Sequence, residues 1–500
     1  MSYTIRDLIN NNKDENIAIT SDNNNVIKYS DLKKFIFDIS GQLASQGITP
    51  SNRAAIVLPN GPEMATAFLS ISSYMSAAPL NPSYKLKEYE FYLQDLMPKI
   101  VIVEKDSHNP AVEAAKNLGI EICEIKKIDN APAGIFNLYD ETSNFELATE
   151  NNEALVLHTS GTTSRPKVVP LTNKNIFSSA INISNSLQLS SQDHCYNIMP
   201  LFHIHGLIAV LSSSINAGAS VYASSGFNAL KFLETANKET ITWYSGVPTM
   251  HQAILMRAKK NPKLAEELNL RFIRSSSASL PPAVFDELKK IFKTTVIEAY
   301  GMTEATHQMT SNPLPPEKQK AGFVGKPAGP EVCIMDSQGN KLNTGEDGEV
   351  CIRGDNVTNG YENNEEANKT AFINGWFRTG DQGHFDNEGY LKISGRLKEI
   401  INRGGEKVSP LEVDNILMEH EAVEQVVTFA VKDNLLGEAI GVAIVLKSGI
   451  DCNEIDIKNY ASKHLADFKI PKYIRFLEEI PKGATGKLQR IGLAEKLGLE

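Results

Sequence analysis

The chain has 500 residues, of which 41% are hydrophobic and 22% are charged, a composition typical of a globular protein with more than one domain. Its formal net charge of -10 argues against the basic surface of a nucleic-acid-binding protein and against an electrostatic membrane anchor. The five cysteines form no C-x-x-C pairs, so neither a zinc site nor a disulfide framework is indicated. These properties favour a small-molecule enzyme of the cytoplasm and leave its oligomeric state open.

The two ends of the sequence carry no targeting pattern. The opening MSYTIRDLINNNKDEN lacks the basic and apolar regions of a signal peptide, and the closing KLGLE is neither a retrieval nor a peroxisomal signal. The uncharged stretch 195–230 is interrupted by His203, His205 and several serines, asparagines and glycines. We interpret this stretch as buried core, because a membrane would tolerate those polar groups poorly.

Short β-rich runs alternate with helical patterns through most of the chain. Strands are predicted at 53–59, 100–104, 153–161, 219–224, 294–301 and 348–354, and helices at 227–238 and 281–292. This alternation predicts an α/β fold with substantial parallel sheet. After residue 396 the pattern changes to small α+β units, so we predict two domains, 1–396 and 397–500.

The stretch HTSGTTSRPK at 158–167 is comparable to a P-loop, because from Gly161 it reads G-x-x-x-x-P-K. A P-loop needs a second glycine, whose backbone N–H reaches phosphate, and a hydroxyl after the lysine that holds magnesium. Here Pro166 has no N–H and Val168 has no hydroxyl. The stretch is therefore not a P-loop. Its hydroxyl-rich turn could still wrap a polyphosphate, although such a segment alone is commonly a solvated Ser/Thr loop.

Five further segments accompany this turn in a definite order. They are PLFHIHG at 200–206, YGMTEATH at 300–307, WFRTGD at 376–381, SGRLKEIINRGGEKVSP at 394–410 and PKGATGKLQR at 481–490. Together the six motifs resemble the adenylate-forming superfamily of acyl-CoA synthetases, luciferases and peptide-synthetase adenylation domains, over essentially the whole chain. Within it, FIRSSSASL and INRGGEKVSP look most like oxalate-CoA ligases.

The resemblance implies an α/β fold of two parts. The large N-terminal domain would contain stacked α/β sheet subdomains and a small β-barrel, and a small mobile α+β C-terminal domain would follow. It also implies ATP, Mg²⁺ and coenzyme A as cofactors and a carboxylic acid as substrate. The acid would attack the α-phosphate, releasing pyrophosphate and leaving an acyl-adenylate, which the thiol of coenzyme A would then attack.

The first step brings two anions together, so it requires fixed positive charge and hydrogen-bond donors. By resemblance Lys487 supplies that charge, although read alone it is one C-terminal lysine among several. Glu304 would hold magnesium, Thr303 would contact the α-phosphate and His203 would lie beside the nucleotide. Without its motif, His203 would be interpreted as a core histidine whose hydrogen bonds are made inside the protein.

The remaining nucleotide contacts are also implied by the resemblance. Asp381 would accept the ribose hydroxyls with help from Arg396, although an isolated aspartate in a G-D turn is more often structural. Tyr300 would lie against the adenine. The other ATP-binding residues are Thr159, Ser160, Gly161, Thr162, Thr163, Lys167 and Gly301.

The second step implies a rotation of the C-terminal domain about a hinge that matches Lys398. The rotation would withdraw Lys487 and bring Gly404 and Gly405 toward the adenylate, where the absent side chains would let pantetheine approach the backbone. Without the resemblance, Lys398 would belong to a plain linker.

Four polar residues occupy the motifs that would line the acyl pocket. They are His205, Ser276, Ser277 and His307. Leaving such groups buried and unpaired costs about 1–3 kcal/mol each, so they disfavour an alkyl chain and favour a short acid with a second carboxylate. We therefore expect oxalate as substrate. A short-chain acyl- or malonyl-CoA ligase, a non-catalytic nucleotide-binding relative and an enzyme that loads a separate carrier protein remain alternatives.

Overall fold

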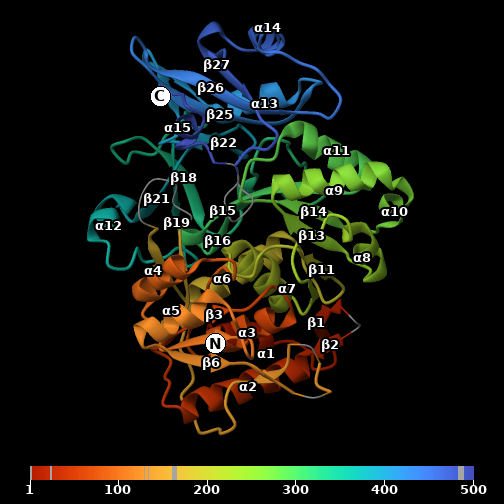
Figure 1. The fold of residues 1–500 in the computed structure, drawn as a ribbon, viewed down its shortest axis with the longest axis vertical. Helices are drawn as coiled ribbons and strands as arrows, with labels where there is room; N and C mark the ends of the chain where they lie inside the picture. Colours follow the sequence, from red (N-terminus) through yellow and green to blue (C-terminus); the bar gives the residue numbers. More distant parts are fainter. Residues whose placement is uncertain are drawn as a thin grey trace.

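The computed structural model describes residues 3–22, 25–128, 130–132, 134–159, 166–481 and 489–499. The predicted site residues Ser160, Gly161, Thr162, Thr163 and Lys487 lie outside these ranges. Along the longest axis of the molecule, the N-terminal elements lie at one end and the C-terminal elements at the other (Figure 1).

A six-stranded sheet lies in the N-terminal part of the molecule. Its order is β10-β9-β4-β3-β5-β6, and only the β10–β9 pair is antiparallel. Its strands are β3 (Arg53–Val57), β4 (Ser76–Pro79), β5 (Ile100–Val103), β6 (Glu121–Glu124), β9 (Glu153–His158) and β10 (Val168–Thr172). Helices α4 (Leu86–Leu96) and α5 (Pro110–Leu118) pack against one face. A small separate ribbon pairs β7 (Lys126–Lys127) with β8 (Phe136–Asn137).

A nine-stranded sheet forms the middle of the molecule, in the order β17-β16-β15-β14-β13-β11-β12-β1-β2. The six strands from β15 to β1 are parallel, whereas the outer pairs are antiparallel. The strands are β1 (Ile17–Ser21), β2 (Asn25–Lys28), β11 (His194–Asn197), β12 (Ser220–Ala223), β13 (Trp243–Gly246), β14 (Phe272–Ser275), β15 (Thr295–Met302), β16 (His307–Ser311) and β17 (Lys326–Pro327). The predicted parallel α/β architecture is confirmed.

The largest hydrophobic core lies between these two sheets. Both sheets contribute to it, together with the elements α1 (Ile5–Asn10), α2 (Tyr29–Ser45), α3 (Pro62–Ser72), α6 (Asn173–Ser186), the π-helix η2 (His205–Ser212) and α7 (Ser213–Asn216). The η2 residues are all buried, as expected for the uncharged stretch 195–230. No helix in the described ranges is long and apolar enough to cross a membrane.

Four helices pack on the other face of the nine-stranded sheet. They are α8 (Phe232–Lys238), α9 (Pro248–Lys260), α10 (Pro262–Glu267) and α11 (Pro282–Phe292). The helix predicted from residue 227 begins only at Phe232, so that boundary is wrong. The Asn228 side chain accepts the backbone N–H groups of Leu230 and Lys231, which holds the preceding residues in a turn.

The resemblance implied a small β-barrel in this part of the chain, where the structure has a five-stranded antiparallel sheet. It contains β18 (Glu331–Met335), β19 (Gly348–Arg353), β20 (Phe372–Ile373), β21 (Trp376–Phe385) and β22 (Leu391–Arg396), and α12 (Glu365–Ala371) adjoins it.

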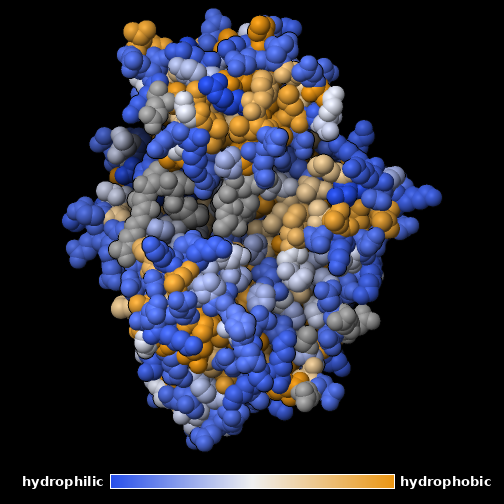
Figure 2. All heavy atoms as spheres, viewed as in Figure 1, coloured by the Kyte–Doolittle hydropathy of each residue, from blue (hydrophilic) through white to orange (hydrophobic). Residues whose placement is uncertain are grey.

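The C-terminal elements have a hydrophobic core of their own. They are β23 (Ile401–Arg403), β24 (Glu406–Val408), α13 (Pro410–Met418), β25 (Val423–Asp433), β26 (Gly437–Leu446), α14 (Glu454–His464), the short η4 (Asp467–Lys469), β27 (Tyr473–Phe476) and α15 (Leu493–Lys496). Hydrophilic atoms cover most of the face seen in Figure 2, and hydrophobic atoms gather over these elements at the top. The chain leaves one sheet at Arg396 and enters the next at Ile401; the boundary at 396/397 stays a prediction.

Candidate functional site

A cavity of about 440 Å³ lies beyond the carboxyl ends of β13, β14 and β15 and reaches β19, β21 and the residues after β22. Ligands of open α/β sheets bind at this edge. Most of the described residues that the sequence singled out line it, namely Thr159, Lys167, His203, His205, Ser277, Gly301, Thr303, Glu304, His307, Arg396 and Lys398. The structure therefore gathers described residues of five of the six motifs, together with Ser277 of FIRSSSASL, around one space.

Two glycines shape the walls of this cavity. A Cβ on Gly206 would lie 2.5 Å from the carbonyl oxygen of Pro200. Glycine at this position therefore lets the residues before η2 pack against its first turn, which begins at His205. A Cβ on Gly301 would lie 2.0 Å from the carbonyl oxygen of His307. Gly301 therefore lets β15 and β16 approach closely at the cavity.

The turn between β15 and β16 carries Thr303 and Glu304 on the short helix η3 (Thr303–Ala305). The Glu304 side chain is 6% exposed, and its Oε1 accepts a hydrogen bond of 2.8 Å from the Tyr361 hydroxyl. Burial and the nearby Glu304 carboxylate both raise the pKa of Tyr361, so its hydroxyl stays protonated and donates. This bond fixes the carboxylate on the cavity wall.

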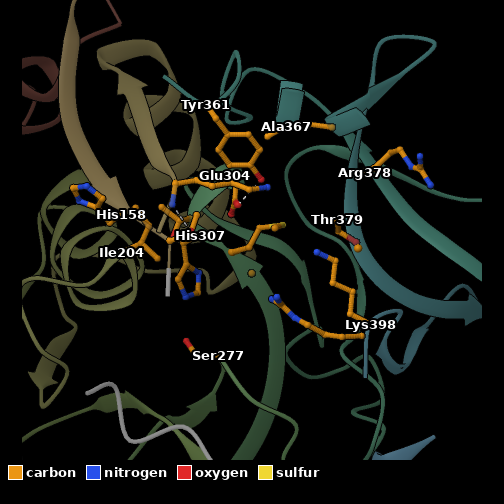
Figure 3. Close-up of a pocket in the computed structure, with 18 of the residues that line it drawn as sticks. His158, Ile204, Ser277, Glu304, His307, Tyr361, Ala367, Arg378, Thr379 and Lys398 are labelled. Atoms are coloured by element: carbon orange, nitrogen blue, oxygen red, sulfur yellow. Dashed lines mark hydrogen bonds between the residues drawn. The ribbon is translucent and has the colours of Figure 1, made fainter. Parts of the chain in front are cut away.

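Cationic side chains face Glu304 across the cavity. The Lys167 Nζ lies 4.1 Å from the centre of the Tyr361 ring. Burial lowers the pKa of Lys167. The Glu304 carboxylate opposes this shift, and the Lys398 charge adds to it. Figure 3 shows Glu304, Tyr361 and His307 together, with Lys398, Thr379 and Arg378 on the opposite side. The described lining thus combines the Glu304 and Glu349 carboxylates with several positive charges, an arrangement suited to a polyanion and a divalent cation.

Asp381 lies at the centre of a second polar group. It is 5% exposed, accepts a hydrogen bond from the Tyr300 hydroxyl, and lies 3.2 Å from Arg396 Nε through its Oδ1. Burial and the adjacent carboxylate raise the pKa of Tyr300 well above its usual range. Neither Tyr300 nor Asp381 is among the lining residues, whereas Arg396 is.

The acyl-pocket residues fall into two groups. His205 and His307 are 2% and 1% exposed, and their ring centres are 4.8 Å apart. Ser277 Oγ lies 3.0 Å from His205 Nδ1 and lines the cavity (Figure 3). Ser276 does not line it, because its fully buried hydroxyl donates to the carbonyl of Ala299.

Gly404 and Gly405 lie in the turn between β23 and β24, outside the cavity lining. Both adopt positive φ angles, which glycine permits without strain. Their predicted contact with pantetheine therefore depends on the predicted rotation of the C-terminal domain.

Several lining residues were missed by the sequence reasoning. Arg378 belongs to the quoted WFRTGD motif, and its guanidinium is held by Glu349 at 2.6 Å. His158 closes the strand before the phosphate turn and pairs with Asp95 at 3.3 Å. Tyr361 had no sequence signal, because it reaches Glu304 from a loop far along the chain. Within the described ranges no three His, Cys, Asp or Glu side chains are grouped to hold a metal ion.

Comparison with known proteins gives consistent matches. Residues 7–362 match the family described as AMP-binding enzyme, and residues 412–487 match the AMP-binding enzyme C-terminal domain. The chain is 46% identical to an oxalate–CoA ligase of Arabidopsis thaliana, over 90% of this chain and 89% of that protein. It is 43% identical to an oxalate–CoA ligase of Saccharomyces cerevisiae, over 88% and 86%. The crystal structure of ATP-bound MatB from Rhodopseudomonas palustris has a TM-score of 0.90 and 26% identity, with 99% of both chains covered.

Proposed function

Because the chain belongs to the AMP-binding enzyme family, we propose that it is an ATP-dependent acid–CoA ligase that converts oxalate to oxalyl-CoA. The observation that carries the choice of oxalate is the polar end of the cavity, where His205, Ser277 and His307 meet beside the Thr303–Glu304 turn. Oxalate has no methylene between its carboxylates, so its second carboxylate must stay within a few ångströms of the reacting one. Donors packed this close to a phosphate site fit that requirement.

In the first half-reaction, one oxalate oxygen bonds to the α-phosphorus of ATP while the bond from that phosphorus to pyrophosphate breaks. Lys167 and Arg396 supply positive charge, and Thr303 is the candidate donor to the α-phosphate. The motifs alone assign a role to the predicted bridging lysine, Lys487, and to the turn residues Ser160, Gly161, Thr162 and Thr163. Their roles are proposals from the sequence.

Glu304 fits a magnesium ion that is coordinated mainly by phosphate oxygens, since its buried carboxylate lines the cavity, whereas the Glu349 carboxylate is paired with Arg378. A bound Mg²⁺ would neutralise charge on the phosphates. Tyr361 keeps the carboxylate oriented through its hydrogen bond. His203 lines the cavity next to His205 and suits a position beside the nucleotide. Asp381, held by Tyr300 and Arg396, is the candidate acceptor for the ribose hydroxyls.

In the second half-reaction, the thiolate sulfur of coenzyme A bonds to the activated carbonyl carbon and AMP leaves. We propose that the domain 397–500 rotates about Lys398 between the two steps, bringing Gly404 and Gly405 toward the adenylate. The separate hydrophobic core of the C-terminal elements supports a domain able to move as a unit. We also propose a cytoplasmic location, which the free thiols of all five cysteines support.

The proposal is tested by pyrophosphate release with a panel of acids. We expect the highest kcat/KM for oxalate, a lower value for malonate and the lowest values for acetate and octanoate. Acetate and octanoate have no second carboxylate, so they leave the buried donors of the pocket unpaired. His307→Ala should lower oxalate activity far more than it raises the KM for ATP. If acetate or a fatty acid outperforms oxalate, the polar-pocket argument is wrong. A preference for malonate would favour the malonyl-CoA ligase alternative.

The hinge has a separate test. Lys398 lies in a turn closed by the N–H groups of Glu399 and Ile400 on the carbonyl of Arg396. Lys398→Pro fixes φ near −65° and disfavours the helical conformation of the residue before it, so it restricts this turn. We expect thioester formation to fall more than pyrophosphate release. Lys398→Ala is the control, since it removes the side-chain charge from the cavity and leaves the backbone free. Equal losses of both half-reactions in the proline variant would argue against rotation at this position.

A further inference from the structure

Arg274 is a buried cation to which the proposed reaction assigns no role. It lies on β14, is 0% exposed, and its neighbours within hydrogen-bond reach are the side chains of Ser245, His205 and Gln308, none of which is a carboxylate. In the part of the chain that the structure describes, its Nε has no hydrogen-bond partner. Burial lowers the pKa of Arg274 to about 9. A buried charge with no carboxylate beside it is costly to the folded state.

The contacts of Arg274 determine where hydrogens lie on its neighbours. Its Nη1 is 3.2 Å from Ser245 Oγ and 3.5 Å from His205 Nε2. A guanidinium can only donate, so both Ser245 Oγ and His205 Nε2 accept from Nη1, and an Nε2 that accepts carries no hydrogen of its own. Ser245 therefore donates its own hydrogen to His205 Nε2, 2.7 Å away.

The other side of the His205 ring faces the cavity. A neutral imidazole has one donor and one acceptor, so with Nε2 accepting, Nδ1 carries the hydrogen. Nδ1 then donates to Ser277 Oγ at 3.0 Å. Because the Ser277 oxygen accepts this bond, its own hydrogen is available to a ligand in the cavity. Ser277 adopts a φ of 72°, an uncommon backbone conformation that is often found at functional sites.

We propose that Arg274 is a positioning residue that acts through Ser245 and His205 to make Ser277 a hydrogen-bond donor to the second carboxylate of the acid substrate. The identity of that substrate rests on the proposed function. Without the obligate donor at one end, the chain of bonds could reverse, and Ser277 would present lone pairs to an anion. The four side chains come from β14, β13, η2 and the residues after β14.

The tautomer of His205 tests this inference without any substrate. In ¹⁵N-histidine-labelled protein, NMR should show His205 in the Nδ1–H form, with the signal identified by its loss in His205→Asn. Ser245→Ala and Arg274→Met should both shift His205 toward the Nε2–H form that dominates in free histidine. Ser245→Thr keeps the hydroxyl and should retain the wild-type tautomer. An Nε2–H tautomer in the wild type would overturn the inference, as would an unchanged tautomer in both disrupting variants.

Kinetics provide the second readout. In Ser245→Ala and Arg274→Met, we expect the ratio of kcat/KM for oxalate to that for acetate to fall by about tenfold, the effect of one hydrogen bond to a charged group. The KM for ATP should change little, and Ser245→Thr should restore the ratio. Equal losses with oxalate and acetate would indicate a merely structural role. If the wild type does not use oxalate, the proposed function fails, whereas the NMR experiment still decides the hydrogen-bond arrangement.

Discussion

Lys487→Ala is expected to reduce pyrophosphate release from acid and ATP by about 10²- to 10³-fold, the usual loss when one preorganised group that stabilises developing charge is removed. Two anions meet in this step, and Lys487 is the residue that the motif PKGATGKLQR assigns to bridging them. Thioester formation from supplied acyl-adenylate should be nearly unchanged, because phosphate and carboxylate are already joined. The two half-reactions are measured separately, as pyrophosphate release and as acyl-CoA formation.

Lys496→Ala is the matched control for this prediction. Lys496 lies on α15, close along the chain; its side chain is exposed, and among the described residues its ammonium donates one hydrogen bond, to Gln489 Oε1. Its loss should affect neither half-reaction. Equal loss of both half-reactions in Lys487→Ala would contradict a role confined to the first step.

Gly301→Ala should be the most damaging single-methyl addition at the cavity. The new Cβ would lie 2.0 Å from the carbonyl oxygen and 2.7 Å from the carbonyl carbon of His307, so β15 and β16 would have to separate. Forcing such an overlap in a packed region costs about 1–3 kcal/mol or more. The shift would also move His307 and the turn that carries Thr303 and Glu304. We expect a lower melting temperature together with a large loss of pyrophosphate release.

Gly246→Ala separates this overlap from the general effect of replacing a glycine beside the cavity. Gly246 ends β13, and its added Cβ would meet the His251 ring at 3.3 Å, a contact that small shifts can relieve. Its melting temperature should change much less. If both variants melt and react alike, the close approach of β15 and β16 is not what the glycine provides.

Local pattern was sufficient for much of the fold. The runs at 53–59 and 348–354 contain the strands Arg53–Val57 and Gly348–Arg353, and the amphipathic segment at 281–292 is the helix Pro282–Phe292. These elements are encoded by neighbouring residues, since apolar runs and a first-turn proline act locally. The helix predicted at 227–238 failed at its start because a single side chain, Asn228, competes for the backbone N–H groups.

The six motifs in one order were sufficient to predict the class of chemistry, because they carry the residues that a phosphate-binding cavity needs. The sequence could not decide which neighbours reach that cavity. Ser276 and Ser277 are adjacent in the chain, yet only Ser277 lines the space, because the Ser276 hydroxyl donates to the carbonyl of Ala299 and the chain bends at Ser277, whose φ is 72°. Tyr361 joins the site from a distant segment by its hydrogen bond to Glu304, and Arg274 is linked to it through Ser245 and His205, which come from other elements. Tertiary structure decided these contacts because they depend on how separate sheets meet, which no local pattern records.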